Sequence, residues 1–308
     1  MADAPPAYAE PAVNPTHVAA VVLDTAPPVV APPPVVAPPP VVAPPPIVAP
    51  PPVMNVQAVP ASGVSLEARL SAMQMELDLP EEIVRDLLSV GGTDIVVIAD
   101  DSSSMNTVSD TTDYMRPLTR WGELRTTLSK LVHMLLVVDH SDGFALKFLN
   151  DPTWYQITSA AALDQVFQAK PQARGLTPLF ANLQLVARGY TGGKNPEGDT
   201  IVLILTDGQP SDAKMPQIQA LLQGRAKSVY CTFVMCTEED AVVEMYNKCV
   251  DPIWGCDISD DYKSEKLEVE RAGKKLNENK WLAKIVLGGK MPKYDKMDEK
   301  AKSCCAVM

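Results

Sequence analysis

The chain has 308 residues, with 27 lysines and arginines against 38 aspartates and glutamates, and a formal net charge of −11. This acidity argues against a nucleic-acid-binding protein, whose binding surface would be basic. Nineteen of the 29 prolines lie in residues 1–60, so these residues cannot pack as a globular domain. The remaining length suits one large domain or two small ones.

The proline-rich segment contains a repeat. Residues 29–52 are four copies of a six-residue unit, Val-Val-Ala-Pro-Pro-Pro, with isoleucine opening the last copy. Proline at half of the positions excludes helices and internal strands and favours polyproline II. We interpret residues 1–63 as a disordered, semi-rigid arm, and a ligand for a proline-binding module is the alternative. Pro5, Pro6 and Tyr8 match the Pro-Pro-x-Tyr ligand of WW domains, which makes a WW-domain protein a candidate partner.

Residues 64–92 are predicted to form a helical lead-in to the main domain. Apolar residues follow Ser65 at helical spacing, and serine suits the N-cap position of such a helix. Pro80 suits the first turn of a second short helix, which Gly91 and Gly92 end. We expect these helices to cover one edge of the domain that follows.

Short apolar runs alternate with amphipathic segments in the main domain, which we assign to residues 93–289. The predicted strands are 95–99, 144–149, 154–158, 201–205, 229–235 and 253–258. The predicted helices are 118–138, 160–168, 179–189, 214–224, 238–248 and 264–279. This alternation predicts an α/β fold, a doubly wound, mostly parallel six-stranded sheet flanked by helices, with a helical extension at its C-terminal end.

Polar side chains follow two of the buried strands directly. The first strand runs into Asp100, and Ser102 and Ser104 follow at alternate positions. A later strand ends just before Asp207, and Thr177 lies in a loop that leads into a helix. Ligands of open α/β sheets bind beyond the carboxyl ends of the strands, so these side chains are expected to meet in one crevice. All are hard oxygen donors, which favour one Mg²⁺ or Mn²⁺ ion over zinc.

The pattern Asp-x-Ser-x-Ser at Asp100, Ser102 and Ser104 resembles the metal-ion-dependent adhesion site of von Willebrand factor A domains. Thr177 in a Gly-x-Thr-Pro setting and Asp207 in Thr-Asp-Gly extend the resemblance in the same order and spacing. It implies that both serines bind the ion directly and that Thr177 joins them in the ligand-competent state. It also implies that the two aspartates act mostly through bound water, and that one coordination position stays open for an acidic side chain of a protein partner.

The resemblance covers roughly residues 94–260 and makes metal-dependent protein binding, without enzymatic activity, the leading prediction. One alternative is that the motif residues only cap helices and form turns. A metal-assisted hydrolase at the same site is another, although neither His133 nor His140 is placed near the metal loops as a general base. A scaffold that works through the proline-rich arm is the third. Asp101 lies close to the site, and the sequence leaves its direction open.

Residues 290–308 are interpreted as a flexible lipidated tail. The chain ends Cys-Ala-Val-Met from Cys305, a C-a-a-X pattern whose final methionine favours a farnesyl group. One prenyl chain gives only reversible membrane binding, so Cys304 is the predicted second site, for palmitate. The sequence shows neither a signal peptide nor a long apolar run. We therefore predict a cytoplasmic protein attached to a membrane surface by its lipid anchor, with its other four cysteines reduced and mostly buried.

Overall fold

The structure is a computed structural model. It describes residues 53–55, 65, 67–68, 71, 74–75, 78–110, 118–138, 143–189 and 198–297. The proline repeat, the Pro5–Tyr8 segment, His140 and the two C-terminal cysteines lie outside the described residues. The WW-ligand and lipidation sites therefore stay predictions.

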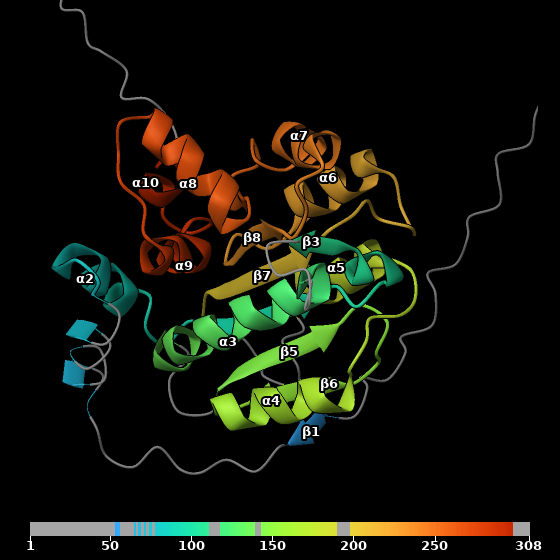
Figure 1. Ribbon diagram of the computed structural model, residues 1–308, viewed down its shortest axis with the longest axis horizontal. Coiled ribbons are helices and arrows are strands. Elements are labelled where there is room, and N and C mark those ends of the chain that lie inside the picture. The colour runs from blue at the N-terminus through green and yellow to red at the C-terminus, as the bar shows by residue number, and fades with distance from the viewer. Residues whose placement is uncertain are drawn as a thin grey trace, which may run out of the picture. The chain divides into compact units, whose positions relative to one another are not determined.

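A seven-stranded sheet in the order β1-β6-β5-β2-β7-β8-β9 forms the centre of the structure (Figure 1). Its strands are β1 (Val53–Asn55), β2 (Asp94–Ala99), β5 (Phe144–Phe148), β6 (Trp154–Ile157), β7 (Thr200–Thr206), β8 (Val229–Met235) and β9 (Cys256–Ser259). All neighbouring pairs are parallel except β5 and β6, which form the predicted hairpin. The doubly wound, mostly parallel fold is thus confirmed. Six strands were predicted, and β1, which comes from the segment assigned to the arm, adds a seventh at the edge.

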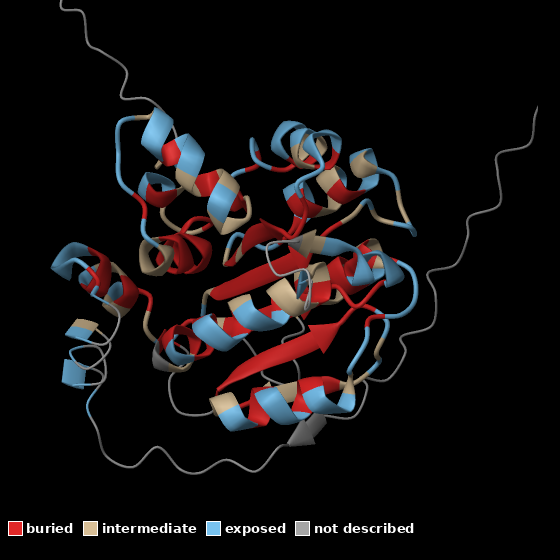
Figure 2. Ribbon diagram, viewed as in Figure 1, coloured by how far each residue is buried: buried red, intermediate tan, exposed pale blue. Residues whose placement is uncertain are grey.

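Helices cover both faces of the sheet, because side chains of a strand alternate between its two faces. One face packs against α2 (Glu81–Ser89), α3 (Arg120–Val138), α4 (Ala160–Ala169), α8 (Tyr262–Arg271), α9 (Glu278–Leu287) and α10 (Pro292–Asp295). The other packs against α5 (Leu179–Ala187), α6 (Met215–Gly224) and α7 (Asp240–Cys249). The central strands are buried on both faces (Figure 2), which explains their continuous apolar sequences.

The lead-in meets the main domain through α2. The Ser65 side chain accepts a hydrogen bond from the Ala68 N–H at 3.2 Å, as expected of an N-cap serine. Pro80 occupies the N-cap position of α2 rather than its first turn. The apolar side of α2 joins the core, and its polar side reaches α10, where Lys293 pairs with Asp86 at 2.5 Å.

Two features of the fold differ from the sequence prediction. The single helix predicted over 264–279 is instead α8 followed by α9. Gly273 has a φ of +80°, which ends α8, and the Asn277 side chain accepts the Lys280 N–H at 2.9 Å to begin α9. A small antiparallel pair, β3 (Val108–Asp110) and β4 (Leu118–Thr119), was not predicted, because strands this short carry no periodic signal.

No transmembrane segment is found in the part of the chain that the structure describes, since none of its helices is both long and apolar enough to span a bilayer. The longest of these helices, α3, has 19 residues and carries charged side chains along its exposed side. Its buried side packs on the sheet.

Candidate metal centre

The predicted site residues lie at the carboxyl end of the sheet. The loop after β2 supplies Asp100, Ser102 and Ser104, and β7 ends directly before Asp207. Because β2 and β7 are paired in parallel, their two loops leave the sheet side by side. Thr177 lies in the loop before α5.

Asp100 anchors the first loop from beneath. Its side chain is fully buried, and each carboxylate oxygen accepts one hydrogen bond. The Ser102 N–H donates to Oδ1 at 2.8 Å, and the Thr206 hydroxyl donates to Oδ2 at 2.6 Å. Burial raises the pKa of Asp100 to about 6, while the hydrogen bonds from Ser102 and Thr206 oppose that rise. The group is therefore mostly ionised at neutral pH, and a nearby cation would favour its charged form.

Two serine hydroxyls bridge the loops. The Oγ atoms of Ser102 and Ser104 are 2.9 Å apart, and the Ser104 hydroxyl donates to Asp207 Oδ1 at 2.8 Å. These contacts join residues that are about a hundred positions apart in the chain into one hydrogen-bonded chain of oxygens. Ser102 and Asp207 are buried, whereas Ser104 is exposed, so the chain opens to solvent at Ser104.

The Thr177 loop docks on the same edge of the sheet. The Ser103 N–H donates to the Gly175 carbonyl oxygen at 3.0 Å, and the Gly175 N–H donates to Ser103 Oγ at 3.2 Å. Thr177 is buried, and Ser211 holds its backbone through hydrogen bonds at both its N–H and its carbonyl oxygen. Among the described contacts, the Thr177 side chain makes no hydrogen bond to Asp100 or Asp207. The structure thus brings its loop to the site without joining its hydroxyl to the network.

Asp101, whose direction the sequence left open, is bonded to Asn150. Its Oδ1 accepts hydrogen bonds from the Asn150 backbone N–H at 2.8 Å and from the Asn150 side chain at 3.0 Å. The Asn150 amide also donates to the Leu176 carbonyl oxygen at 2.7 Å, so one side chain ties two of the loops together. A Cβ atom on Gly175 would lie 2.5 Å from the Asn150 side chain, and its φ is +111°, so this position requires glycine.

Arg120 adds a positive charge that the sequence did not predict at the site. Its Nη1 lies 3.0 Å from Asp207 Oδ2, and its Nη2 lies 2.8 Å from Glu239 Oε1. Only 11% of the Arg120 side chain is exposed, and Asp207 is fully buried. Both oxygens of Asp207 are therefore engaged, one by Ser104 and one by Arg120. The guanidinium offsets part of the negative charge that would attract a metal ion.

The donor set suits a hard divalent cation. Two carboxylates and two hydroxyls converge from neighbouring strands, all with oxygen atoms. Oxygen donors of this kind are those that Mg²⁺ and Mn²⁺ prefer. The buried carboxylates lie beneath and the exposed serine lies at the surface, so a cation would be reachable from solvent.

Three residues with a role in this network were missed: Thr206, Asn150 and Arg120. Thr206 carried a weak signal, as the one polar residue at the end of an apolar strand. Asn150 and Arg120 lie in segments that extend the family resemblance, residues 148–150 and 120–124, but the sequence predicted no role for them at the site, because their contacts are 49 and 87 residues away in sequence. Only the fold brings them to the site.

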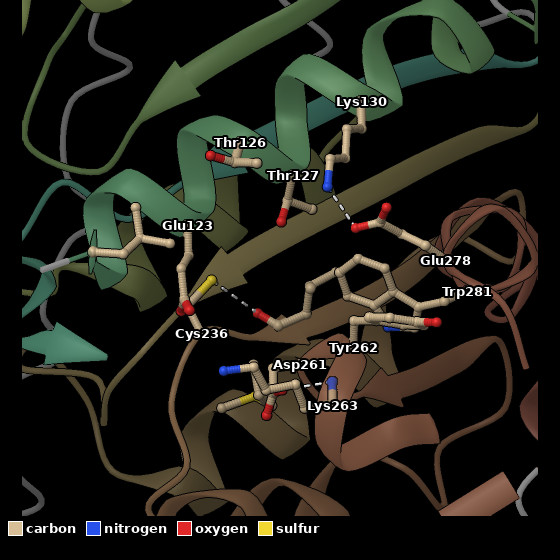
Figure 3. Close-up of a pocket in the computed structure, with 13 residues that line it drawn as sticks. Glu123, Thr126, Thr127, Lys130, Cys236, Asp261, Tyr262, Lys263, Glu278 and Trp281 are labelled. Atoms are coloured by element: carbon tan, nitrogen blue, oxygen red, sulfur yellow. Dashed lines mark hydrogen bonds and ion pairs between the residues drawn. The ribbon is translucent and has the colours of Figure 1, made fainter. Parts of the chain in front are cut away.

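A cleft of about 210 Å³ lies between α3, the end of β8 and the α8–α9 region (Figure 3). Lys130 and Glu278 pair across it at 2.5 Å, and Cys236 and Trp281 contribute to its lining. Burial raises the pKa of the Cys236 thiol well above its ordinary value, so this thiol is protonated and unsuited to act as a nucleophile. The cysteine is a core residue, as expected.

The remaining candidates have ordinary positions, with one exception. His133 is exposed on α3 and does not belong to the loops that form the metal centre. Trp121, Trp154 and Trp281 are buried core residues. Trp254 is 54% exposed and packs against Tyr230, with ring centroids 5.5 Å apart and the ring planes tilted by 52°.

No family model and no curated protein match the chain. Similar solved structures include a von Willebrand factor type A protein from Catenulispora acidiphila, with a TM-score of 0.36 and 13% identity, over 68% of this chain and 42% of that one. They also include the manganese-loaded TRAP protein of Plasmodium vivax, with a TM-score of 0.38 and 10% identity, over 58% of this chain and 72% of that one. This chain thus spans less than half of the C. acidiphila chain. Likeness at these TM-scores does not establish a family, and the fold class rests on the strand order described above.

Proposed function

We propose that the sheet-based domain is a von Willebrand factor A domain that binds one Mg²⁺ or Mn²⁺ ion and, through it, an acidic side chain of a partner protein. Its ligands would be Asp100, Ser102, Ser104, Thr177 and Asp207. The observation that carries the proposal is the continuous hydrogen-bonded chain from Asp100 through the two serines to Asp207, open to solvent at Ser104. A helix cap or a turn needs a single hydroxyl, whereas this set joins two strands.

Some residues of the site would position the ligands, and others would bind the ion. Thr206 fixes the Asp100 carboxylate, and Asn150 fixes the loops through Asp101. The serine hydroxyls are neutral, so a bound ion would keep much of its charge and attract an incoming carboxylate strongly. Arg120 neutralises Asp207 on the side away from Ser104, which limits the negative charge that would otherwise repel an acidic partner. No residue of this set is free to act as a general base, which supports a binding role.

A pull-down tests the binding role. Full-length protein should retain partners in Mg²⁺ and release them in chelator. Ser102→Ala/Ser104→Ala, which removes both hydroxyls without changing charge, should lose this retention. Ser228→Ala, at the amino-terminal side of β8, is the matched control and should behave as wild type. Retention that is the same in Mg²⁺ and in chelator, or in the double variant, would contradict the proposal.

An enzymatic role makes a different prediction. The proposal expects no Mg²⁺-dependent turnover of a phosphoester panel by the purified protein above that of Asp100→Ala. Turnover that requires Asp100 would replace the binding role by metal-assisted hydrolysis.

We also propose that the domain is held at the cytoplasmic face of a membrane by a prenyl group on Cys305, with palmitate on Cys304 as the second anchor. The support is the C-a-a-X sequence alone. Cys305→Ser should move the protein from the membrane fraction to the soluble fraction of a eukaryotic cell. An unchanged membrane fraction would refute the anchor.

Deleting residues 1–60 should leave the Mg²⁺-dependent partners unchanged. Loss of these partners would favour a scaffold that works through the proline-rich arm.

A further inference from the structure

We propose a second divalent-cation site, for Ca²⁺, formed by Asp251, Asp257 and Asp295 and independent of the proposed metal centre. The three side chains come from the loop after α7, from β9 and from the end of α10. One carboxylate oxygen of each lies within 4.8 Å of the others, and this is the one such group of acidic side chains within the described part of the chain.

Asp257 provides the decisive observation. Its side chain is 1% exposed, and its carboxylate oxygens accept no hydrogen bond from a backbone N–H or a basic side chain of the described residues, the acidic Asp295 being the neighbour in contact. Buried carboxylates are ordinarily paired or hydrogen-bonded, because removing a charge from water without compensation is strongly unfavourable. Lys284 favours the charged form of Asp257, but its Nζ is bonded to Glu265 Oε1 at 2.6 Å. Lys284 therefore compensates Asp257 only in part, and the carboxylate needs a further positive charge or a proton shared with a neighbouring carboxyl group.

The backbone is shaped to admit this carboxylate. A Cβ atom added at Gly288, which follows α9, would lie 1.8 Å from Asp257 Oδ2. Only the absence of a side chain at Gly288 leaves room for the oxygen beside α9. The Asp257 carboxylate is thus buried beside Gly288, whereas Asp251 and Asp295 lie closer to solvent.

A metal ion explains the arrangement better than a shared proton. A proton would satisfy one pair of carboxyl groups, whereas three meet here. Asp251 is exposed and Asp295 half-buried, so an ion would have access from solvent. Oxygens on opposite sides of a Ca²⁺ ion lie about 4.6–5.2 Å apart, given its usual bond lengths, and the three oxygens fit within that span. Three carboxylates also match the oxygen-rich, flexible coordination of Ca²⁺ better than the compact octahedron of Mg²⁺.

Such an ion would connect the end of the domain to its edge strand. α10 lies beside α9 (Figure 1), and Asp295 is its last residue. Ca²⁺ would fix α10 against β9. Binding should therefore slow hydrogen exchange in α10 as well as raise the melting temperature.

The test uses full-length protein carrying Ser102→Ala/Ser104→Ala, so that the proposed Mg²⁺ centre does not contribute. Ca²⁺ should raise the melting temperature of this protein, and Tb³⁺ should show luminescence sensitised by Trp254, which lies between Asp251 and Asp257 in sequence. Adding Asp251→Asn should weaken Ca²⁺ competition for Tb³⁺ by at least about tenfold, because affinity follows the number of charged ligands. Asp251 is exposed, so this change should not unfold the protein.

Glu270→Gln, an exposed acid on α8, is the charge-matched control and should bind as its parent does. Asp257→Asn should lose the Ca²⁺-dependent rise in melting temperature. The proposal is overturned if Ca²⁺ leaves the parent protein unchanged, in which case a proton compensates Asp257. It is also overturned if Asp251→Asn and Glu270→Gln bind Tb³⁺ alike. Neither result bears on the Mg²⁺ centre, because the parent already lacks the two serine hydroxyls of that centre.

Discussion

Arg120 is the residue that most affects how the metal centre could work. It pairs with Asp207, a proposed metal ligand, while that carboxylate also accepts a hydrogen bond from Ser104. The metal-free state is stabilised by this ion pair, so a cation must compete with the guanidinium for Asp207. Glu239 holds the other side of the guanidinium and keeps Arg120 in place.

Replacing Arg120 should therefore strengthen metal binding while weakening the metal-free fold. We expect Arg120→Gln to bind Mg²⁺ about five- to tenfold more tightly, which corresponds to about 1 kcal/mol. In chelator the same variant should lose about 1–3 kcal/mol of unfolding free energy, because Asp207 is left buried without its cation. Calorimetric titration and urea unfolding measure the two effects.

Arg125→Gln is the matched control. Arg125 also lies on α3 and pairs with Asp164 at 3.3 Å, but both side chains are about half exposed. An exposed pair contributes little, so neither Mg²⁺ affinity nor stability should change by more than about 1 kcal/mol. Weaker Mg²⁺ binding in Arg120→Gln would show that the guanidinium assists the site instead of competing with the ion.

Asp260 gives a prediction about pH. Burial raises the pKa of Asp260 to about 7, with a further rise from Glu265. A carboxyl whose pKa is raised by folding stabilises the fold when protonated, and this stability is lost as pH rises through the folded pKa. Wild type should therefore lose about 2–3 kcal/mol between pH 5 and pH 8 relative to Asp260→Asn. Urea unfolding at the two pH values tests this, and parallel pH profiles for the two proteins would contradict it.

Helix α9 is held in place by a buried ion pair. Lys284 Nζ lies 2.6 Å from Glu265 Oε1 on α8, with both side chains almost fully buried. Trp281, also on α9, donates from its indole N–H to the Asp260 carbonyl oxygen at 3.1 Å. The two contacts join α9 to α8 and to the loop after β9. Breaking the ion pair should affect the whole C-terminal region of the domain.

We expect Lys284→Met to destabilise the domain by about 3–5 kcal/mol, because Glu265 would remain buried without its cation. The double variant Lys284→Met/Glu265→Leu should recover most of this loss, since neither member of the pair then remains as an unpaired buried charge. Lys130→Met, which breaks the exposed Lys130–Glu278 pair, is the control and should change stability by less than about 1 kcal/mol. If Lys284→Met costs no more than Lys130→Met in urea unfolding, the pair is not what holds α9.

At the scale of elements, the sequence predicted most of the sheet but not every helix boundary. The strands around β2 and β7 were predictable because strands buried on both faces must be apolar throughout. The break between α8 and α9 was not, because the apolar spacing continues past Gly273. The break depends on the left-handed backbone of Gly273 and on the Asn277 cap. Both are local effects that apolar spacing does not reveal.

The meeting of Asp100, the two serines and Asp207 was predictable for a different reason. Parallel strands place their carboxyl ends at one edge, so residues that follow two neighbouring strands must meet. Which side chains complete the network was not predictable. Arg120 and Asn150 reach the site from a helix and from a loop whose position depends on the packing of the whole domain.

At the scale of the whole molecule, part of the negative charge of the chain is gathered in two groups of acidic residues. Asp207 and Glu239 pair with the Arg120 guanidinium at the carboxyl end of the sheet, where Asp100 is also buried. Asp251, Asp257 and Asp295 form a second acidic group. Two proposed cation sites would each offset part of the net charge of −11. The domain is expected to be more stable in divalent cations than in chelator.

The most direct test of the central claim is the effect of Mg²⁺ on the melting temperature of the full-length protein. Asp251→Asn serves as the parent, so that the proposed Ca²⁺ site contributes little. At about 100 times its dissociation constant, Mg²⁺ should add about 2.7 kcal/mol, a rise of roughly 5–10 °C for a domain of this size. Adding Ser102→Ala/Ser104→Ala should abolish that rise. A parent protein that melts at the same temperature in Mg²⁺, in Mn²⁺ and in chelator would contradict the claim that this edge of the sheet binds a metal ion.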